Sequence, residues 1–423
     1  MLRALKAVKQ NKGAAGIDKV TVDELDEYFK RNWAGIKTAI LAKKYKPQPV
    51  RRVYIPKPNG KQRPLGIPTM ADRVIQQAVA QTLVKIIDSS FSNSSHGFRP
   101  GRSCHSAMEQ ALQNLNDGCE WVIDIDIEKY FDTVNHDKLI SILREKVNNA
   151  ATLHLIRKYL QAGVMEDGVF SKSEEGVPQG GPLSPILSNI YLDKLDKELE
   201  SRGLRFVRYA DDVVIFVKSE MAANRVMKSI TSWLERKLFL KVSATKTKVV
   251  RPSKSEFLGF GFWKDARGWK CRPLNDRKAS LYRKCKEILT RKKAAARPLG
   301  VTFTRLNQVI RGWINYFRIG SMKTFAEDFG EWLRHKVRVV IFKQWKRPRT
   351  IYRNLMRLNK VFKCKMTEED ILKVAYARFG VYRQCSQEVV NYLLSPEVLE
   401  TANEKRKRPG LINPLRQYLE GSQ

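Results

Sequence analysis

Residues 204–217 read LRFVRYADDVVIFV, two apolar runs on either side of Asp211 and Asp212. Runs rich in branched and aromatic residues that meet at a short polar break predict two strands joined by a tight turn. A third carboxylate, Asp126, ends the run WVIDID (121–126), which predicts a buried strand. Carboxylates without partners are costly to bury, and a neighbouring like charge raises that cost. Divalent cations would relieve both penalties.

The three carboxylates suit a two-metal site. Two ions about 3.5–4 Å apart, held by Asp side chains and substrate phosphates, stabilise an in-line attack on a phosphate. Mg²⁺ fits this role because it is hard and prefers carboxylate and phosphate oxygens. An Asp pair such as Asp211 and Asp212 in a hairpin turn is, by itself, more often a solvated turn. Asp124 and Asp132, which flank Asp126, are expected to make structural hydrogen bonds.

Outward from this centre, hydrophobic periodicity predicts a mixture of helices and strands. Strands at roughly 49–56 and 62–67 are joined by KPNG (57–60), a strong turn signal, and a second hairpin spans 163–174. Helices are predicted at about 1–10, 22–44, 70–88, 103–116, 136–147, 150–162, 182–201 and 219–236, with short strands near 247–251 and 256–262. After Trp263 the sequence becomes basic and aromatic, with helices predicted near 276–294, 302–318 and 324–345.

The charge balance points to an anionic partner. Lys and Arg number 79 against 43 Asp and Glu, a net charge of +36 over 423 residues. The surplus is densest in residues 264–423, which hold 37 basic and 14 acidic residues. Such a surplus repels itself unless an anion neutralises it, and nucleic acid does so with release of counterions. Composition alone leaves a soluble basic protein or a membrane-surface binder as alternatives.

Other features of the composition narrow the class of protein. Six scattered cysteines without a C-x-x-C pair argue against zinc sites and a disulfide framework, and they fit a reducing compartment. The start, MLRALKAVKQNKG, lacks the apolar core of a signal peptide, and no apolar run approaches the ~20 residues of a membrane span. The sequence therefore predicts a cytoplasmic protein of two or three domains with no membrane partner.

Several motifs stand in order around the carboxylates. YADD (209–212), DIEKYFD (126–132) and GVPQGGPLSP (176–185) together resemble the palm of reverse transcriptases. NKGAAGID (11–18) and HGFRPGRS (96–103) resemble segments of group II intron and non-LTR enzymes.

The second half of the chain narrows the resemblance. FLGF (257–260) resembles the primer grip, and RLNQVIRGWINYFRIGSM (305–322) and LRHKVRVVIFKQWKRPRT (333–350) resemble the thumb and maturase segment of group II intron proteins. None of the five histidines lies near the C-terminal end with partner cysteines, as an H-N-H endonuclease would need. The chain is therefore identified as a group II intron-encoded reverse transcriptase and maturase of the endonuclease-lacking, IIC-like bacterial type.

The resemblance implies an α+β fold of the right-hand polymerase type. Its parts are fingers, a palm with an antiparallel sheet, and a helical thumb, followed by a basic helical maturase segment. Fingers and palm would occupy residues 1–263, the thumb and maturase helices 264–350, and a basic, DNA-binding-like maturase tail 351–423.

The resemblance also assigns roles around the carboxylates. Asp126, Asp211 and Asp212 are the expected catalytic residues, and they would hold two Mg²⁺ ions with the backbone carbonyl of Ile127 as a further ligand. Phe131 would lie beneath the sugar of the incoming dNTP, where its ring would exclude a 2′-hydroxyl. The residues expected to contact the nucleotide are Lys57, Arg63, Phe131, Gln179, Gly180 and Lys246.

Basic residues on the finger hairpin and in the thumb are expected to contact RNA phosphates. The expected set is Arg52, Arg311, Arg334, Lys336, Arg338, Lys343, Lys346 and Arg347. Three aromatic residues between them, Trp313, Tyr316 and Phe317, are expected to pack in the thumb core instead.

The resemblance implies an RNA-directed DNA polymerase that binds group II intron RNA, assists its splicing and reverse-transcribes it during retrohoming. Its partners would be the intron RNA, an RNA template with a DNA primer, target DNA and dNTPs, and dimerisation is left open. Two alternatives remain. One is a reverse transcriptase of another bacterial system, such as a retron, a diversity-generating element or a CRISPR-associated enzyme. The other is an RNA-binding splicing factor without catalysis, against which the intact Asp126, Asp211 and Asp212 argue.

Overall fold

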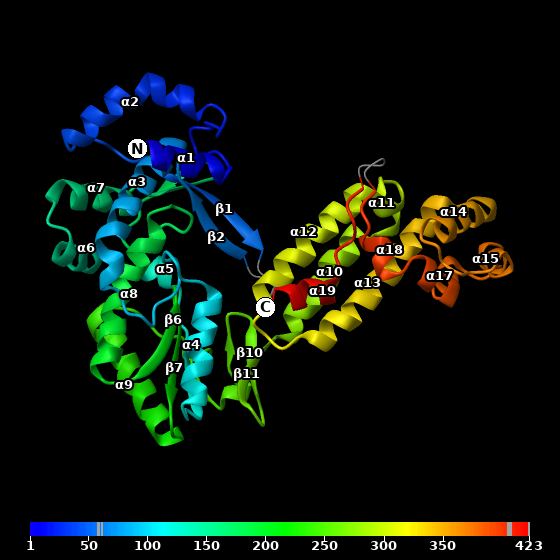
Figure 1. Ribbon diagram of the computed structural model, residues 1–423. Coiled ribbons are helices and arrows are strands. Elements are labelled where there is room, and N and C mark those ends of the chain that lie inside the picture. The colour runs from blue at the N-terminus through cyan, green and yellow to red at the C-terminus, as the bar shows by residue number, and fades with distance from the viewer. Residues whose placement is uncertain (57–59, 61, 404–407, 422–423) are drawn as a thin grey trace. The chain divides into compact units, whose positions relative to one another are not determined.

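The computed structural model describes residues 1–56, 60, 62–403 and 408–421, and the chain divides into two compact units. The first unit is Met1–Phe257 and the second is Leu258–Gln423 (Figure 1). The predicted domain boundaries at residues 263 and 350 stay predictions.

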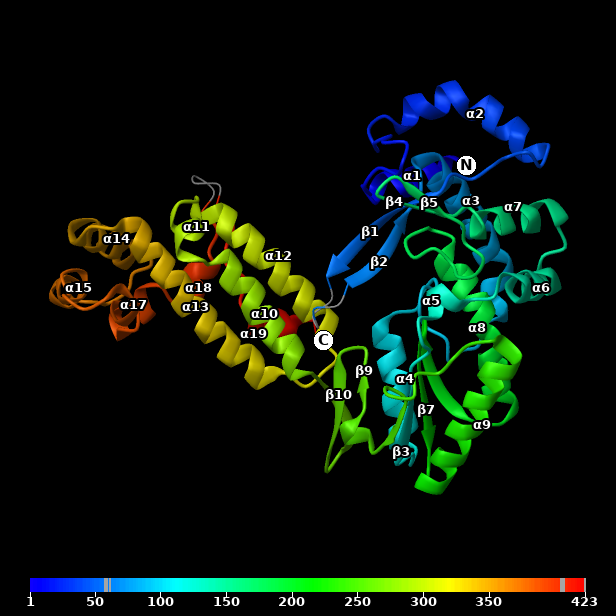
Figure 2. The same cartoon turned by 180° about the vertical axis from the view of Figure 1, so that it is seen from behind.

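Four antiparallel strands form the palm sheet of the first unit, in the order β6-β7-β3-β8. They are β3 (Trp121–Ile125), β6 (Arg205–Tyr209), β7 (Asp212–Val217) and β8 (Lys248–Val250). The helices that cover the sheet are α4 (Cys104–Asn116), α8 (Ser184–Ser201) and α9 (Glu220–Leu238) (Figures 1 and 2). Because helices pack against these strands, their apolar runs are buried, and the strands predicted at 121–126 and 204–217 are confirmed.

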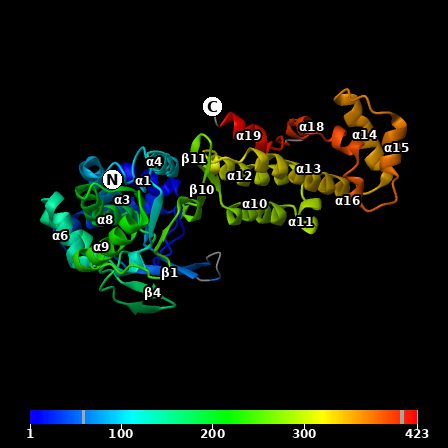
Figure 3. The same cartoon turned by 90° about the horizontal axis from the view of Figure 1, so that it is seen from below.

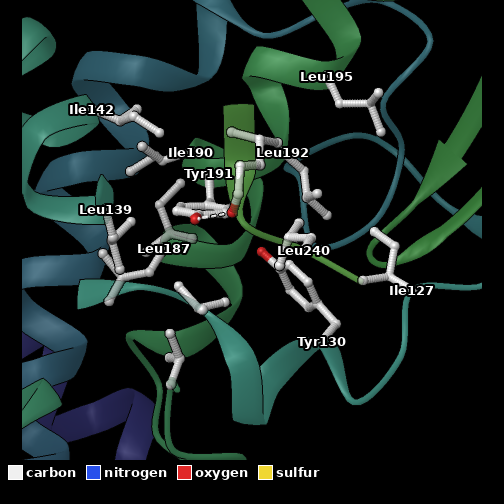
Figure 4. Packing of buried hydrophobic residues seen from close by; sticks show 14 of the residues in the cluster. Ile127, Tyr130, Leu139, Ile142, Leu187, Ile190, Tyr191, Leu192, Leu195 and Leu240 are labelled. Atoms are coloured by element: carbon white, nitrogen blue, oxygen red, sulfur yellow. Dashed lines mark hydrogen bonds between the residues drawn. The ribbon is translucent and has the colours of Figure 1, made fainter. Parts of the chain in front are cut away.

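The core of the first unit centres on α8. Five of its side chains, Leu187, Ile190, Tyr191, Leu192 and Leu195, are at most 1% exposed. Figure 4 shows them packed with side chains from α6 (His136–Lys146) and from the segment that follows β3. Burying a large apolar side chain contributes about 1.5–3 kcal/mol relative to leaving it exposed, so this cluster is a main source of stability for the palm.

A second sheet forms the fingers, in the order β2-β1-β4-β5. Its strands are β1 (Val50–Pro56), β2 (Gln62–Ile67), β4 (Val164–Glu166) and β5 (Val169–Ser171). The two antiparallel hairpins, β1–β2 and β4–β5, confirm the prediction. The parallel pairing of β1 with β4 was not predicted, because it joins segments that are far apart in the sequence. The remaining elements of this unit are α1 (Leu2–Gln10), α2 (Leu25–Leu41), α3 (Met70–Ile87), η1 (Asp88–Ser90), α5 (Tyr130–Thr133), α7 (Ala150–Leu160), η2 (Pro252–Lys254) and β9 (Glu256–Phe257).

Side-chain caps fix where several of these helices begin. Thr69 Oγ1 accepts a hydrogen bond from the Asp72 backbone N–H at 3.2 Å at the start of α3. Ser103 caps α4 in the same way through Ser106, whose side chain accepts from the Ser103 N–H in return. Such a cap stabilises a helix by about 1 kcal/mol, which explains why the helix starts predicted near 70 and 103 are confirmed.

The second unit begins with a hairpin and continues as helices. Its elements are β10 (Phe260–Asp265), β11 (Gly268–Pro273), α10 (Asn275–Ile288), α11 (Arg291–Ala295), α12 (Leu299–Phe317), α13 (Lys323–Trp345), α14 (Pro348–Val361), α15 (Glu368–Ala375), α16 (Val381–Gln384), α17 (Glu388–Leu393), α18 (Pro396–Glu400) and α19 (Pro414–Glu420). Helices α10, α12 and α13 lie along one another (Figure 3). Of the three predicted helices, those at 302–318 and 324–345 are confirmed, and that at 276–294 is divided into α10 and α11. Among the helices in the described part of the chain, none combines the length and apolar character of a membrane span.

Aromatic packing joins the long helices of the second unit. The ring of Tyr282 lies 4.8 Å from that of Trp332, and Trp313 lies 4.7 Å from Phe317 between ring centroids. Tyr316 stacks on Phe260 at 5.9 Å. The expected core role is confirmed for the buried Phe317 and the half-buried Trp313, whereas Tyr316 is 40% exposed and lies at the edge of this packing, so its expected core role is wrong.

A buried ion pair crosses the palm of the first unit. Arg208 on β6 and Asp196 on α8 are both 0% exposed, and they meet through Nη2–Oδ2 at 2.5 Å and Nε–Oδ1 at 2.7 Å. The same guanidinium also donates to Ser95 Oγ at 2.8 Å and to Asn189 Oδ1 at 3.0 Å. Satisfying a buried charge from several sides is what makes its desolvation tolerable.

We expect Arg208→Met to lower the free energy of unfolding by about 3–5 kcal/mol, because it leaves the Asp196 carboxylate buried and unpaired. Urea unfolding of the full chain measures this change. The double variant R208M/D196L removes both charges and should recover most of the loss. The control is Arg205→Met, since Arg205 pairs with Asp117 at the surface and should contribute less than about 1 kcal/mol. Equal losses in the two single variants would contradict the assignment.

Candidate active site

The turn between β6 and β7 carries two of the three carboxylates. Tyr209 pairs with Asp212, so only Ala210 and Asp211 form the turn. Ala210 has a φ of +57°, a left-handed conformation that costs a non-glycine residue about 1 kcal/mol or more. The last pair between β3 and β7 is Ile125 with Val213, and Asp126 follows directly. The register therefore brings Asp126 to the same end of the sheet as Asp211 and Asp212.

The segment HGF (96–98) packs against the turn between β6 and β7. The His96 N–H donates to the Arg208 carbonyl at 2.9 Å, and Arg208 Nη1 donates to the Ala210 carbonyl at 3.0 Å. A Cβ on Gly97 would lie 2.3 Å from the Ala210 nitrogen, closer than any side chain fits. Sequence reasoning gave Arg208 and Gly97 no role. The one available signal was a charged residue inside an apolar strand, which requires a buried partner.

Two of the carboxylates, Asp211 and Asp212, have a raised pKa. Desolvation is the largest cause for Asp212, followed by the charges of Asp211 and Asp126, and together they raise its pKa to about 6. Although the Asp212 side chain opens to solvent, enough protein surrounds it for desolvation to dominate. Desolvation also raises the pKa of Asp211, and the charge of Arg63 opposes that rise. The cluster is therefore short of positive charge.

This chemistry fits divalent metal. The donors are hard carboxylate oxygens, and a cation would relieve the repulsion that raises the Asp212 pKa. The bridge between Ile127 and Val242 uses the Asp126 carbonyl and the Glu128 N–H, so the Ile127 carbonyl stays outside it. Within the described residues, no three His, Cys, Asp or Glu side chains are drawn together as a preformed metal cage. One cation is already present, because Lys246 Nζ lies 3.0 and 3.1 Å from the two carboxylate oxygens of Asp126.

Asp124 and Asp132, which flank Asp126, lie in different surroundings. Asp124 accepts a hydrogen bond from Ser255 Oγ at 2.8 Å, which confirms its expected structural role. Asp132 lies exposed on α5, in the wall of a cavity.

The loop PQGG (178–181) is fixed against the fingers. Arg63 Nε donates to Gln179 Oε1 at 2.9 Å, and the Gly66 N–H of β2 donates to the Gln179 carbonyl at 2.7 Å. Gly180 has a φ of +124°, and a Cβ there would lie 2.6 Å from the Gly66 carbonyl oxygen. Glycine is therefore required at position 180 both by conformation and by space.

A cavity of about 660 Å³ lies between the finger sheet and this loop. Arg52, Phe131, Gln179 and Gly66 are among the residues that line it. The structure thus brings Phe131, Gln179 and Arg52 to one place, while Arg63 contacts Gln179 and influences Asp211. Lys57 lies outside the described residues.

The basic residues of the second unit fall into two groups. Arg311, Lys346 and Arg347 are exposed, and Arg334, Lys336 and Lys343 are half-buried. Lys336 Nζ lies 4.7 Å from the ring centroid of Tyr382, which orients it without neutralising it.

Arg338 requires a correction. It is 7% exposed, and its guanidinium donates to the Leu394 carbonyl at 2.9 and 3.1 Å and also bonds to the side chain and backbone of Asn391. Helix α17 covers this face of α13, so Arg338 supports the fold and is not available to RNA.

Two family models match the chain. Residues 55–262 match "Reverse transcriptase (RNA-dependent DNA polymerase)", and residues 278–359 match "Group II intron, maturase-specific domain". The first match contains every carboxylate of the site, and the second contains the exposed and half-buried basic residues named above.

Curated relatives agree with both models. Protein YkfC of Escherichia coli is 35% identical over 289 residues, which are 59% of this chain and 76% of that protein. The group II intron-encoded protein LtrA of Lactococcus lactis is 40% identical over 48% of this chain and 34% of its own length. The putative COX1/OXI3 intron 2 protein of Saccharomyces cerevisiae is 34% identical over 59% of this chain and 28% of its length. The chain thus spans about a third or less of the two intron proteins. It belongs to the reverse transcriptases, the RNA-directed DNA polymerases, and carries behind its polymerase domain the maturase domain of group II intron-encoded proteins.

Proposed function

We propose that this protein copies group II intron RNA into DNA and assists the splicing of the same RNA by binding it. The observation that carries the polymerase half is the convergence of Asp126, Asp211 and Asp212 at one end of the palm sheet. The match to the maturase-specific domain supports the splicing half and favours it over retron, diversity-generating and CRISPR-associated systems.

Asp126, Asp211 and Asp212, with the Ile127 carbonyl, would hold two Mg²⁺ ions. When bound, such ions stabilise the charge that develops on the phosphate under in-line attack. The protein's own side chains do the rest. Arg63 and Lys57 neutralise the triphosphate, and the Gln179–Gly180 backbone supports the nascent base pair.

Phe131 is proposed to select the sugar of the nucleotide. Its ring packs edge-on against Tyr130 at 5.2 Å between centroids, and Tyr130 is itself 2% exposed. A ring fixed in this way presents a wall that a 2′-hydroxyl would strike. The selectivity for dNTPs therefore follows from a rigid contact.

The exposed basic residues Arg311, Lys346 and Arg347, with the half-buried Arg334, Lys336 and Lys343, are proposed to contact intron RNA phosphates, and Arg52 the template. An RNA template with a DNA primer, target DNA and dNTPs are the remaining proposed partners. The free cysteines fit the reducing cytoplasm as the place of activity.

The carboxylate assignment is tested with Asp211→Asn in primer extension on an RNA template with Mg²⁺ and dNTPs. We expect extension to fall about 1,000-fold, because a lost metal ligand removes several kcal/mol of transition-state stabilisation. Asp117→Asn, at a surface carboxylate that pairs with Arg205, is the matched control and should extend normally. Splicing of the cognate intron should be unchanged in both variants. If the wild type promotes splicing but extends no primer, the protein is a binding factor and the polymerase proposal fails.

Phe131→Ala tests the sugar contact. We expect the ratio of rNTP to dNTP incorporation to rise about 10- to 100-fold, because the variant removes the group that excludes the 2′-hydroxyl. Single-nucleotide incorporation kinetics with rGTP and dGTP measure the ratio. A uniform drop for both nucleotides, with the ratio unchanged, would make Phe131 a packing residue.

The RNA contacts are tested by comparing a double variant, K346A/R347A, with Arg338→Ala. For the exposed pair we expect weaker intron RNA binding and a salt dependence reduced by about 1–2 in log–log slope, since two phosphate contacts are lost. Thermal stability should not change. Arg338→Ala should lower the melting temperature, because it leaves backbone and amide groups of α17 without donors. Filter binding across KCl concentrations measures RNA binding, and calorimetry measures the melting temperature. The same outcome for both variants would contradict the assignment of Lys346 and Arg347 to RNA contact and of Arg338 to the fold.

A further inference from the structure

The ammonium group of Lys246 forms an ion pair with the carboxylate of Asp126. Its ammonium nitrogen lies 3.1 Å from Oδ1 and 3.0 Å from Oδ2, so a single cation spans both carboxylate oxygens. The Lys246 side chain is 68% exposed and that of Asp126 is 35% exposed. An ordinary ion pair at this exposure is weak and interchangeable with water.

The backbone around this pair is fixed, unlike that of an ordinary surface pair. The Ser243 N–H donates to the Asp126 carbonyl at 2.8 Å, and the Asp126 N–H donates to Thr247 Oγ1 at 3.2 Å. Between these two anchors the chain turns, with the N–H groups of Lys246 and Thr247 both donating to the Ser243 carbonyl at 3.3 and 2.9 Å. The turn that carries Lys246 is therefore tied on both sides to the main chain of Asp126.

This placement sets the ammonium against any metal that uses Asp126. A ligand carboxylate needs at least one oxygen directed at the ion, and both Asp126 oxygens face Lys246. Two cations sharing one carboxylate also repel each other. A metal that takes the lone pairs of Asp126 used by Lys246, or that lies close enough to repel the ammonium, therefore competes with Lys246.

We propose that Lys246 is a positioning residue that competes with metal for Asp126 and is released when metal binds. It holds the Asp126 carboxylate in place before metal arrives, and it lowers the affinity of the site for metal in the absence of nucleotide. Release frees the ammonium for the anionic substrate, so metal binding and phosphate neutralisation become linked. This inference rests on the proposed metal role of Asp126.

The matched control for this proposal is Lys248, two residues further along. Its Nζ lies 3.7 Å from Asp124 Oδ2, so Lys248→Met removes the same charge from the same segment without freeing Asp126. Lys246→Arg keeps the charge and offers a two-pronged donor to the carboxylate. Together with Lys246→Met, which removes the competing charge, these two variants separate direct competition from a general change in charge.

The experiment measures Mn²⁺ binding to the full chain, without nucleic acid or nucleotide, by electron paramagnetic resonance and calorimetry. We expect Lys246→Met to bind Mn²⁺ about 3- to 10-fold more tightly than wild type, Lys246→Arg equally or less tightly, and Lys248→Met within about twofold of wild type. Circular dichroism checks that each variant folds. Equal or weaker binding by Lys246→Met, or equal tightening by Lys248→Met, overturns the competition. If Asp211→Asn binds Mn²⁺ as wild type does, the proposed metal role fails instead, and this inference fails with it.

Discussion

The ion pair between Arg208 and Asp196 is the interaction on which the catalytic end of the palm depends. Removing two charges from water costs several kcal/mol each, and the pair is stable only because every prong of the guanidinium is used. Those prongs reach Asp196 and Asn189 on α8, Ser95 in the loop before α4, and the carbonyl of Ala210. One side chain therefore joins three segments of the chain, and one of them is the turn formed by Ala210 and Asp211.

The hydrogen bonds of Arg208 stabilise a strained turn in which two carboxylates, Asp211 and Asp212, repel each other. Ala210 is held in a left-handed conformation, and Gly97 approaches it too closely for any side chain to fit. Relaxation of the turn would lower both the backbone strain and the repulsion between Asp211 and Asp212. The buried pair opposes that relaxation, so the carboxylates stay together before any cation arrives. Burial and the nearby charges of Asp211 and Asp126 together raise the pKa of Asp212 to about 6 in this arrangement.

Local pattern was enough to predict the strands β3, β6 and β7, because alternation and polar breaks are properties of short segments. The roles of the three carboxylates came from the resemblance to reverse transcriptases, since an Asp pair in a turn is by itself more often solvated. Contacts between residues far apart in the sequence could not be predicted from local pattern. Nothing near Arg208 in the sequence indicates Asp196 as its partner, and nothing in β1 indicates β4. Arg338 shows the same limit. It lies on a basic helix, and whether it faces solvent depends on α17, a helix that forms more than 40 residues later and that no local signal predicted.

Net charge alone therefore overstates the surface available to RNA. Arg208 and Arg338 contribute to the net charge of +36, yet the guanidinium of each donates its hydrogen bonds to buried acceptors within the protein. A guanidinium is well suited to this use, since its fixed fork satisfies several acceptors at once. Lys346, in contrast, is exposed at the end of α13. Lys246 differs from both the buried arginines and the exposed Lys346. Its side chain is exposed and can separate from Asp126, while the backbone of its turn is held to Asp126 by hydrogen bonds.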